Sequence, residues 1–346
     1  MGVILIISYA AVAVFVLAVV ARFVKISRLP MHLRWELYPV AHEKRAHYGG
    51  SYLETPEWWT KPRESSTLGE LKVMVPEILL LAGVWEHNRS HWLRSYPFHL
   101  GLYLLAGLVG LLIVGGAASA AGAQIAAEGG GTLATVLYHA TYLVGWVGLG
   151  LAMLGTLALL GRRLLNEDYR EYTKKADYFN LLFFAVTIAV ALVAHAVADP
   201  TFAGLRSYFR ELVTLSLASG SVAFTGKATL LAVEIVLGCL LLAYIPLTHM
   251  SHFFTKWFMY HDIRWADEPN LKGGKLESKI QGVLGYPVSW LAPHVRGDGK
   301  KNWVDVATSP VEEKAEAEEK AEAKEKAEAK EKAETKEKAE AKDGGK

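Results

Sequence analysis

Long apolar runs alternate with charged segments along this chain of 346 residues. A helix that crosses the hydrocarbon core of a bilayer needs about 20 predominantly apolar residues. Five runs reach this length, over residues 3–24, 97–117, 133–160, 178–198 and 228–250. Hydrophobic residues make up 52% of the chain and charged residues 21%, and the two kinds are segregated instead of being mixed around one soluble core. The sequence therefore predicts an all-α integral membrane protein, a bundle of five transmembrane helices.

The distribution of Lys and Arg predicts the orientation of this bundle, because cytoplasmic connections carry an excess of both. The connection over residues 118–132 has neither residue. The connection between the third and fourth runs carries five: Arg162, Arg163, Arg170, Lys174 and Lys175. We therefore expect the N-terminus outside and the C-terminus in the cytoplasm.

The same pattern divides the chain into five regions: a first transmembrane helix (1–24), a cytoplasmic segment (25–96), a four-helix haem-binding membrane domain (97–250), a cytoplasmic C-terminal segment (251–311) and a charged low-complexity tail (312–346). Residues 73–85 are apolar but too short to span and contain Pro76, so they predict a buried or interfacial segment. The tail repeats Lys, Ala and Glu without an apolar face, which is typical of a solvated helix or a disordered segment.

The connection over residues 205–217 has the pattern of a helix lying in the membrane interface or capping the bundle. The residues that we expect on its apolar face are Leu205, Tyr208, Phe209, Leu212 and Val213. The charged residues that we expect elsewhere on it are Arg206, Arg210 and Glu211.

Five histidines lie within the predicted spans or at their ends, where an ionisable group is costly and usually functional: His99, His139, His195, His249 and His252. The topology places His99 with His249 or His252 near the cytoplasmic surface, and His139 with His195 near the external surface. Two stacked b haems require such pairs, since each low-spin iron takes one imidazole on either face. The single cysteine, Cys239, excludes covalent haem attachment and a cysteine-ligated cluster. A membrane histidine is as often a helix contact or a proton-relay group, so that alternative stays open.

Several segments resemble the gamma subunit of respiratory nitrate reductase: YPFHLG at residues 96–101, LLGRRLL at 159–165 and PLTHMSHFF at 246–254. Three further segments, MHLRWELYP at 31–39, YGGSY at 48–52 and YHDIRW at 260–265, resemble the subset of that family that accompanies heterodisulfide-reductase-like iron–sulfur subunits. The resemblance implies a cytochrome b of the bacterial inner membrane, the multi-pass subunit of a quinone-linked oxidoreductase complex.

The resemblance also implies site residues. His99 and His252 match the inner-haem ligands, whereas His249 falls where the family often has a basic residue. The outer-haem positions match about Val109 and Leu231, which are not ligands. Either the outer haem is absent or His139 and His195 supply it from a different pair of helices. We favour the second, which gives two b haems in total.

The predicted function is electron exchange between a membrane quinone, menaquinone or ubiquinone, and a cytoplasmic iron–sulfur partner. A periplasmic multihaem cytochrome is a further candidate partner, and no nucleic acid is expected. The residues expected to bind the quinone near the outer haem are Asp199, Arg210, Glu211 and Lys227. Two alternatives remain: a proton-relay transporter that uses His139, His195 and Glu234, and a haem-free membrane anchor for a soluble redox enzyme.

Overall fold

A computed structural model describes residues 2–29, 66–216, 225–264, 272–290, 295 and 297–309. The regular elements within these ranges are helices, and no strand is found there. Five helices are long and apolar enough to cross a membrane: Gly2–Ser27 (α1), Arg89–Ala120 (α4), Thr132–Leu165 (α5), Lys175–Val197 (α7) and Gly226–Leu247, which contains α9 (Thr229–Tyr244). The prediction of an all-α protein with five potential spans is confirmed. The repetitive tail and residues 30–65 lie outside the described ranges.

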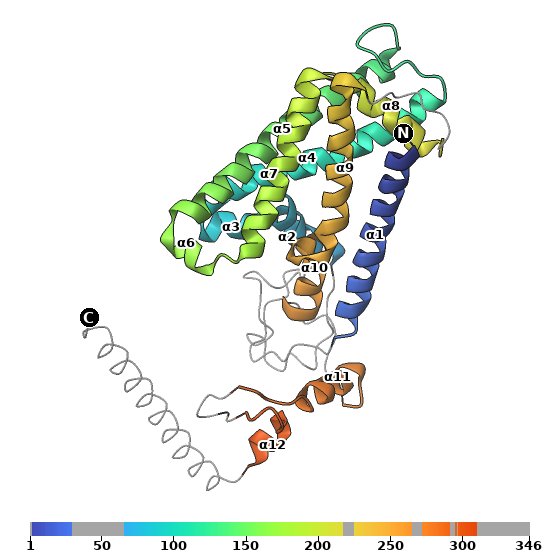
Figure 1. The fold of residues 1–346 in the computed structure, drawn as a ribbon. Coiled ribbons are helices and arrows are strands. Elements are labelled where there is room, and N and C mark those ends of the chain that lie inside the picture. The colour runs from blue at the N-terminus through green and yellow to red at the C-terminus, as the bar shows by residue number, and fades with distance from the viewer. Residues whose placement is uncertain are drawn as a thin grey trace, which may run out of the picture. The chain divides into compact units, whose positions relative to one another are not determined.

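The long helices form a series of neighbours: α4 packs on α5, α5 on α7, α7 on α9 and α9 on α1 (Figure 1). The first of two compact units holds these helices and extends along the chain to Trp257. The second unit contains two short helices, α11 (Lys275–Leu284) and α12 (Trp303–Thr308). Within it, backbone N–H groups of Lys301 and Lys300 stabilise the carboxylate of Asp298 and lower its pKa.

Two glycines let α4 and α5 approach until their backbones touch. A Cβ atom added at Gly101 of α4 would overlap the backbone of Ala152 on α5, and one added at Gly155 would overlap the backbone of Phe98. Small residues at a helix crossing permit close van der Waals packing, which drives helix association in membranes where both lipid and helix surfaces are apolar. The crossing determines the position of α4, which carries His99.

The fifth span is interrupted near its end, within the predicted run of residues 228–250. Helix α9 ends at Tyr244 and is followed by two 3₁₀ turns, Ile245–Leu247 and His249–Ser251, before α10 (His252–Phe258) begins. Pro246 explains the interruption, because proline has no backbone N–H and its ring clashes with the preceding helical turn. The break gives His252 a place at the start of a separate short helix.

Residues 73–85 fall in two short helices, α2 (Thr67–Leu80) and α3 (Ala82–His87), which are too short to span. Leu81 separates them with a left-handed φ of 53°. The Glu77 carboxylate accepts a hydrogen bond from the N–H of Gly83 at 2.7 Å across this turn. Helix α4 then begins at Arg89, eight residues before the predicted start of the span, because the side chain of Asn88 caps it.

Helix α8 (Ala203–Val213) corresponds to the predicted interfacial helix, but the expected division of its faces is wrong. Arg206 and Glu211 are buried together with Leu205 and Tyr208, whereas Val213 is exposed. The cause lies on α4, where Gly115 faces the Arg206 side chain and Gly116 faces the α8 backbone at 2.8 Å from a would-be Cβ atom. These glycines allow α8 to pack so closely on α4 that charged residues of α8 are buried together with its apolar residues.

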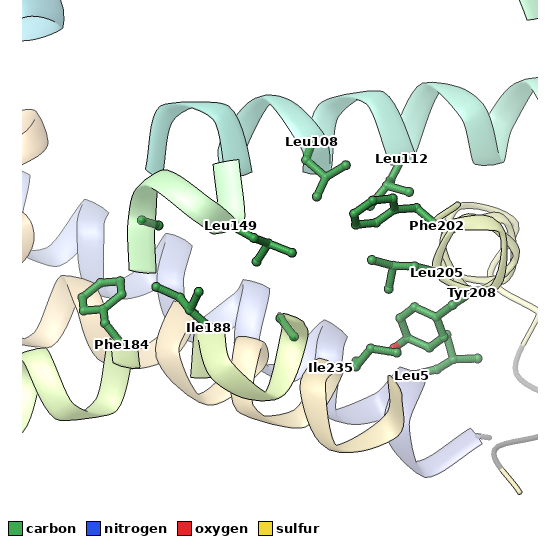
Figure 2. Close-up of a cluster of buried hydrophobic side chains, with 12 residues drawn as sticks. Leu5, Leu108, Leu112, Leu149, Phe184, Ile188, Phe202, Leu205, Tyr208 and Ile235 are labelled. Carbon is green, nitrogen blue, oxygen red and sulfur yellow. The ribbon is translucent and has the colours of Figure 1, made fainter. Parts of the chain in front are cut away.

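The apolar core of the first unit lies between α8 and the long helices (Figure 2). Leu108 and Leu112 of α4 meet Phe202 and Leu205 there, and Tyr208 lies beside Leu5 of α1. The hydroxyl groups of Tyr208 and Ser8 are 2.7 Å apart. Burial raises the pKa of Tyr208 to about 12, so this phenol stays protonated and α8 is joined to α1 by a neutral hydrogen bond.

Candidate haem-iron site

His99 lies on α4 close to the glycine crossing with α5. Its Nδ1 atom is 2.8 Å from the carbonyl oxygen of Ser95, one turn earlier. A carbonyl oxygen can only accept, so Nδ1 carries the proton and Nε2 is left as the basic nitrogen. Metal-ligating histidines typically donate their second ring N–H in this way, which orients the ring and increases the basicity of the ligating atom.

His252 is the first residue of α10; its side chain is exposed, and its ring lies edge-on beside that of His99. The centres of the two rings are 6.2 Å apart, at an interplanar angle of 60°. The Nδ1 atom of His252 lies 3.3 Å from the carbonyl oxygen of His249. Among the described residues, no hydrogen bond is made by Nε2 of either ring, so both histidines present the same atom for coordination.

This geometry fits an iron atom held between two imidazoles. Histidine nitrogen binds a metal at roughly 2 Å, so two rings on opposite sides of one iron place their centres about 6 Å apart. The described part of the chain contains no group of three or more His, Cys, Asp or Glu side chains that could hold a metal by themselves. A haem iron needs only the two axial ligands that this pair offers.

His249, the alternative inner ligand, points elsewhere. Its Nε2 atom lies 3.4 Å from the Asp177 carboxylate at the start of α7, and its side chain is 63% exposed. His252 is thus the histidine of this segment that faces His99. The contribution of His249 to the pair is its carbonyl oxygen, which accepts from His252.

Helix α10, which begins at His252, also makes an ion pair near its C-terminal end. The ammonium group of Lys256 on α10 forms an ion pair with Glu77 of α2, and both side chains are largely buried. Glu77 accepts from Gly83 as well, so the ion pair links α10 to the α2–α3 turn. Partly buried pairs of this kind keep more of their Coulomb attraction than exposed ones.

His195 on α7 is fully buried and uses both ring nitrogens for other contacts. Nδ1 is 2.9 Å from the carbonyl oxygen of Asp199, and Nε2 is 3.1 Å from Oε1 of Glu234 on α9. The ring of Phe202 covers it at a centroid distance of 3.9 Å. Coordination of iron by His195 would require the loss of one of these hydrogen bonds.

His139 on α5 is exposed, and its ring contacts only the neighbouring Tyr138 among the described residues. The ring contact that joins His99 and His252 has no counterpart between His139 and His195. Two haem-ligand pairs were expected, and the arrangement brings one pair together. The side chains at the second pair, as they lie, do not fit an iron atom.

The four residues predicted to bind a quinone differ in their burial. Asp199 is buried, and its carboxylate accepts from the N–H groups of Gly204 and Leu205 at the start of α8. Glu211 is buried on α8, whereas Arg210 and Lys227 are exposed. Asp199 therefore has a structural role as a cap.

Sequence reasoning assigned Arg206 to the polar side of α8 and missed its burial. Its guanidinium donates to the carbonyl oxygens of Ile125 and Thr201 at 3.4 and 3.5 Å. Burial lowers the pKa of Arg206, while the nearby charge of Asp199 opposes the shift. The amphipathic pattern of α8 carried no signal of this contact, since it depends on two glycines of α4.

Comparison with known proteins identifies the family of the chain. The family described as the nitrate reductase gamma subunit matches residues 82–266, more than half of the chain. The chain belongs to the nitrate reductase gamma subunit family. No curated protein and no solved structure matches it. Members of this family are membrane cytochrome b subunits of redox complexes, which implies haem b. The matched region contains both His99 and His252, whereas α1 lies outside it.

Proposed function

We propose that this nitrate reductase gamma subunit homologue exchanges electrons between a membrane quinone and a cytoplasmic iron–sulfur partner. The observation that carries the proposal is the His99–His252 pair, with ring centres 6.2 Å apart. Haem b, when bound, supplies a one-electron redox centre. His99 and His252 would hold it.

The protein's own contribution at this pair is orientation. The Ser95 and His249 carbonyl oxygens keep the proton of each histidine on Nδ1. In the neutral form of each ring, Nε2 is therefore the nitrogen with the lone pair that coordination requires. The packing of α4 on α5 and the Lys256–Glu77 pair hold the two rings from different elements.

The number of haems is a separate part of the proposal. The family resemblance favours two haems, with His139 and His195 as the outer ligands. The hydrogen bonds of His195 to Asp199 and Glu234 support a count of one. We therefore propose one haem at His99 and His252 and expect a haem-to-chain ratio of one.

The quinone and the iron–sulfur partner are separate parts of the proposal. The buried carboxylates Asp199 and Glu211 and the exposed Arg210 and Lys227 remain the candidate quinone contacts. The heterodisulfide-reductase-like iron–sulfur subunit rests on the resemblance of three segments that lie mostly outside the described residues. Co-purification with an iron–sulfur protein of the same host tests that part.

The experiment for the main proposal is a reduced-minus-oxidised absorption spectrum of the purified full-length protein. We expect b-type bands, and we expect the same bands when a menaquinol or ubiquinol analogue replaces the chemical reductant. Bands that appear only with the chemical reductant would support the assignment as a cytochrome b and contradict the proposed electron exchange with a quinone. A colourless protein would support the haem-free anchor or the proton relay.

The contact between His195 and Glu234 favours one second candidate, a proton relay. Since Nδ1 of His195 must donate to a carbonyl oxygen, one proton lies between Nε2 and Oε1, on either atom. Such a buried pair stores a proton within a span, where ionisable groups mark function. Proteoliposomes with an internal pH dye test it: if Glu234→Gln leaves proton flux at the wild-type value, the relay is rejected.

A further inference from the structure

Arg22, near the end of α1, reaches the break between α9 and α10. Its Nη1 atom donates to the carbonyl oxygen of Thr248 at 2.6 Å and to the hydroxyl of Ser251, and its Nη2 atom donates to the carbonyl oxygen of Leu247 at 3.2 Å. The forked guanidinium therefore binds two residues that precede the 3₁₀ turn at His249–Ser251 and the last residue of that turn. A single side chain from the N-terminal helix bridges the interruption.

The break needs such a partner. Pro246 ends the regular helix, and Thr248 has an extended backbone with φ −114° and ψ −178°. Carbonyl groups in an irregular segment lack the partners that a regular helix provides, and in a membrane they cannot rely on water. Arg22 donates to two such groups, the carbonyl oxygens of Leu247 and Thr248, which lie beyond the end of α9.

The contact bears directly on the orientation of His252. Ser251 precedes it in the chain and is 3% exposed. The Ser251 hydroxyl also donates to the carbonyl oxygen of Thr248 at 2.9 Å, so these two residues of the break are linked to each other and to Arg22. The direction in which α10 begins, and with it the His252 ring, depends on this cluster.

We propose that Arg22 is a positioning residue for His252, acting through Thr248 and Ser251. The proposal rests on the proposed function, in which His252 is an iron ligand. It assigns to α1, which lies outside the family-matched region, a part in building the haem site. Removing a group that orients a metal ligand typically weakens metal binding about 10- to 100-fold.

The test compares Arg22→Gln with two further variants in the purified full-length protein. Arg22→Lys keeps the charge but lacks the planar fork that reaches three acceptors. Lys25→Gln removes a charge one turn away, where the side chain is exposed. The readouts are haem retention, the low-spin electron paramagnetic resonance signal, and carbon monoxide binding to the reduced haem, which requires that an axial ligand has left the iron.

We expect Arg22→Gln to lower haem retention at least tenfold or to make the reduced haem reactive towards carbon monoxide. Arg22→Lys should restore part of the low-spin signal, and Lys25→Gln should match the wild type. If Arg22→Gln does not assemble, Ser251→Ala decides, and we expect a carbon monoxide-reactive fraction there too.

Two results would overturn the proposal in different ways. An unchanged low-spin signal without carbon monoxide binding, in Arg22→Gln or in an assembled Ser251→Ala, would overturn the role of Arg22 and leave the haem site intact. A wild-type protein without b-type bands would instead overturn the proposed function, and the role of Arg22 with it.

Discussion

At the scale of single residues, the candidate site depends on the contacts of the second ring nitrogen, Nδ1, which would not bind iron. His99 and His252 each direct Nδ1 to a backbone carbonyl oxygen. His195 directs Nδ1 to a carbonyl oxygen as well, but its Nε2 meets the Glu234 carboxylate. The difference between a ligand pair and a buried proton-sharing pair thus lies in what faces Nε2.

Replacement of His195 by Ala tests this distinction. We expect an unchanged haem-to-chain ratio and a lower thermal midpoint in detergent, because Glu234 loses its buried partner, a loss that costs about 3 kcal/mol. His139→Ala is the control, since its ring is exposed and should change neither quantity. Loss of the same b-type spectral component in both variants would instead support His139 and His195 as outer-haem ligands.

The sequence could predict the role of a residue where that role depends on neighbouring residues in the chain. The family resemblance matched His252, and not His249, to an inner-haem ligand, and the ring of His252 lies 6.2 Å from that of His99. Arg22 and Arg206 could not be found in this way, because their partners lie far away in the chain, at Thr248 and Ile125. A single sequence contains no direct signal of such long-range contacts.

At the scale of elements, the sequence predicted which segments form helices better than it predicted the residues at which those helices begin and end. Apolar run length predicted the long helices, and the short apolar run with Pro76 was predicted not to span. The interruption at Pro246 was not predicted, because it lies inside the apolar run over residues 228–250. The burial of α8 was not predictable, since it depends on Gly115 and Gly116 of another helix. Glycine at such a crossing is recognised only when the opposing backbone is known.

The α4–α5 crossing makes a testable prediction at this scale. We expect Gly101→Ala to lower stability by about 1–3 kcal/mol and to reduce haem content, because the new methyl group would overlap the Ala152 backbone and push α4 away. Gly107→Ala on the same helix is the matched control, with no atom within 4 Å of its added Cβ. Equal stability of the two variants, measured by thermal melting in detergent, would contradict the close crossing.

At the scale of the whole molecule, five potential spans and the distribution of Lys and Arg predict the topology. The 118–132 connection should face the outside, and the connection between α5 and α7, which contains α6 (Glu167–Tyr172), should face the cytoplasm. Because Cys239 is the single cysteine, its replacement by Ser gives a background for labelling.

Cysteines introduced at Ala123 and Glu167, both exposed, test this topology. In intact spheroplasts, a membrane-impermeant maleimide should label Ala123→Cys, and it should label Glu167→Cys only after permeabilisation. If only Glu167→Cys is labelled before permeabilisation, the orientation is the reverse of the predicted one. The His99–His252 pair would then lie at the outer side.

The measurement that tests the central claim most directly is the haem-to-chain ratio of three single variants, His99→Ala, His252→Ala and His249→Ala, each purified beside the wild type. A ratio near one for the wild type and for His249→Ala, with near-complete loss in His99→Ala and His252→Ala, is the predicted result. A ratio in His99→Ala and His252→Ala equal to that of the wild type, or loss in His249→Ala with retention in His252→Ala, would contradict the proposed haem site.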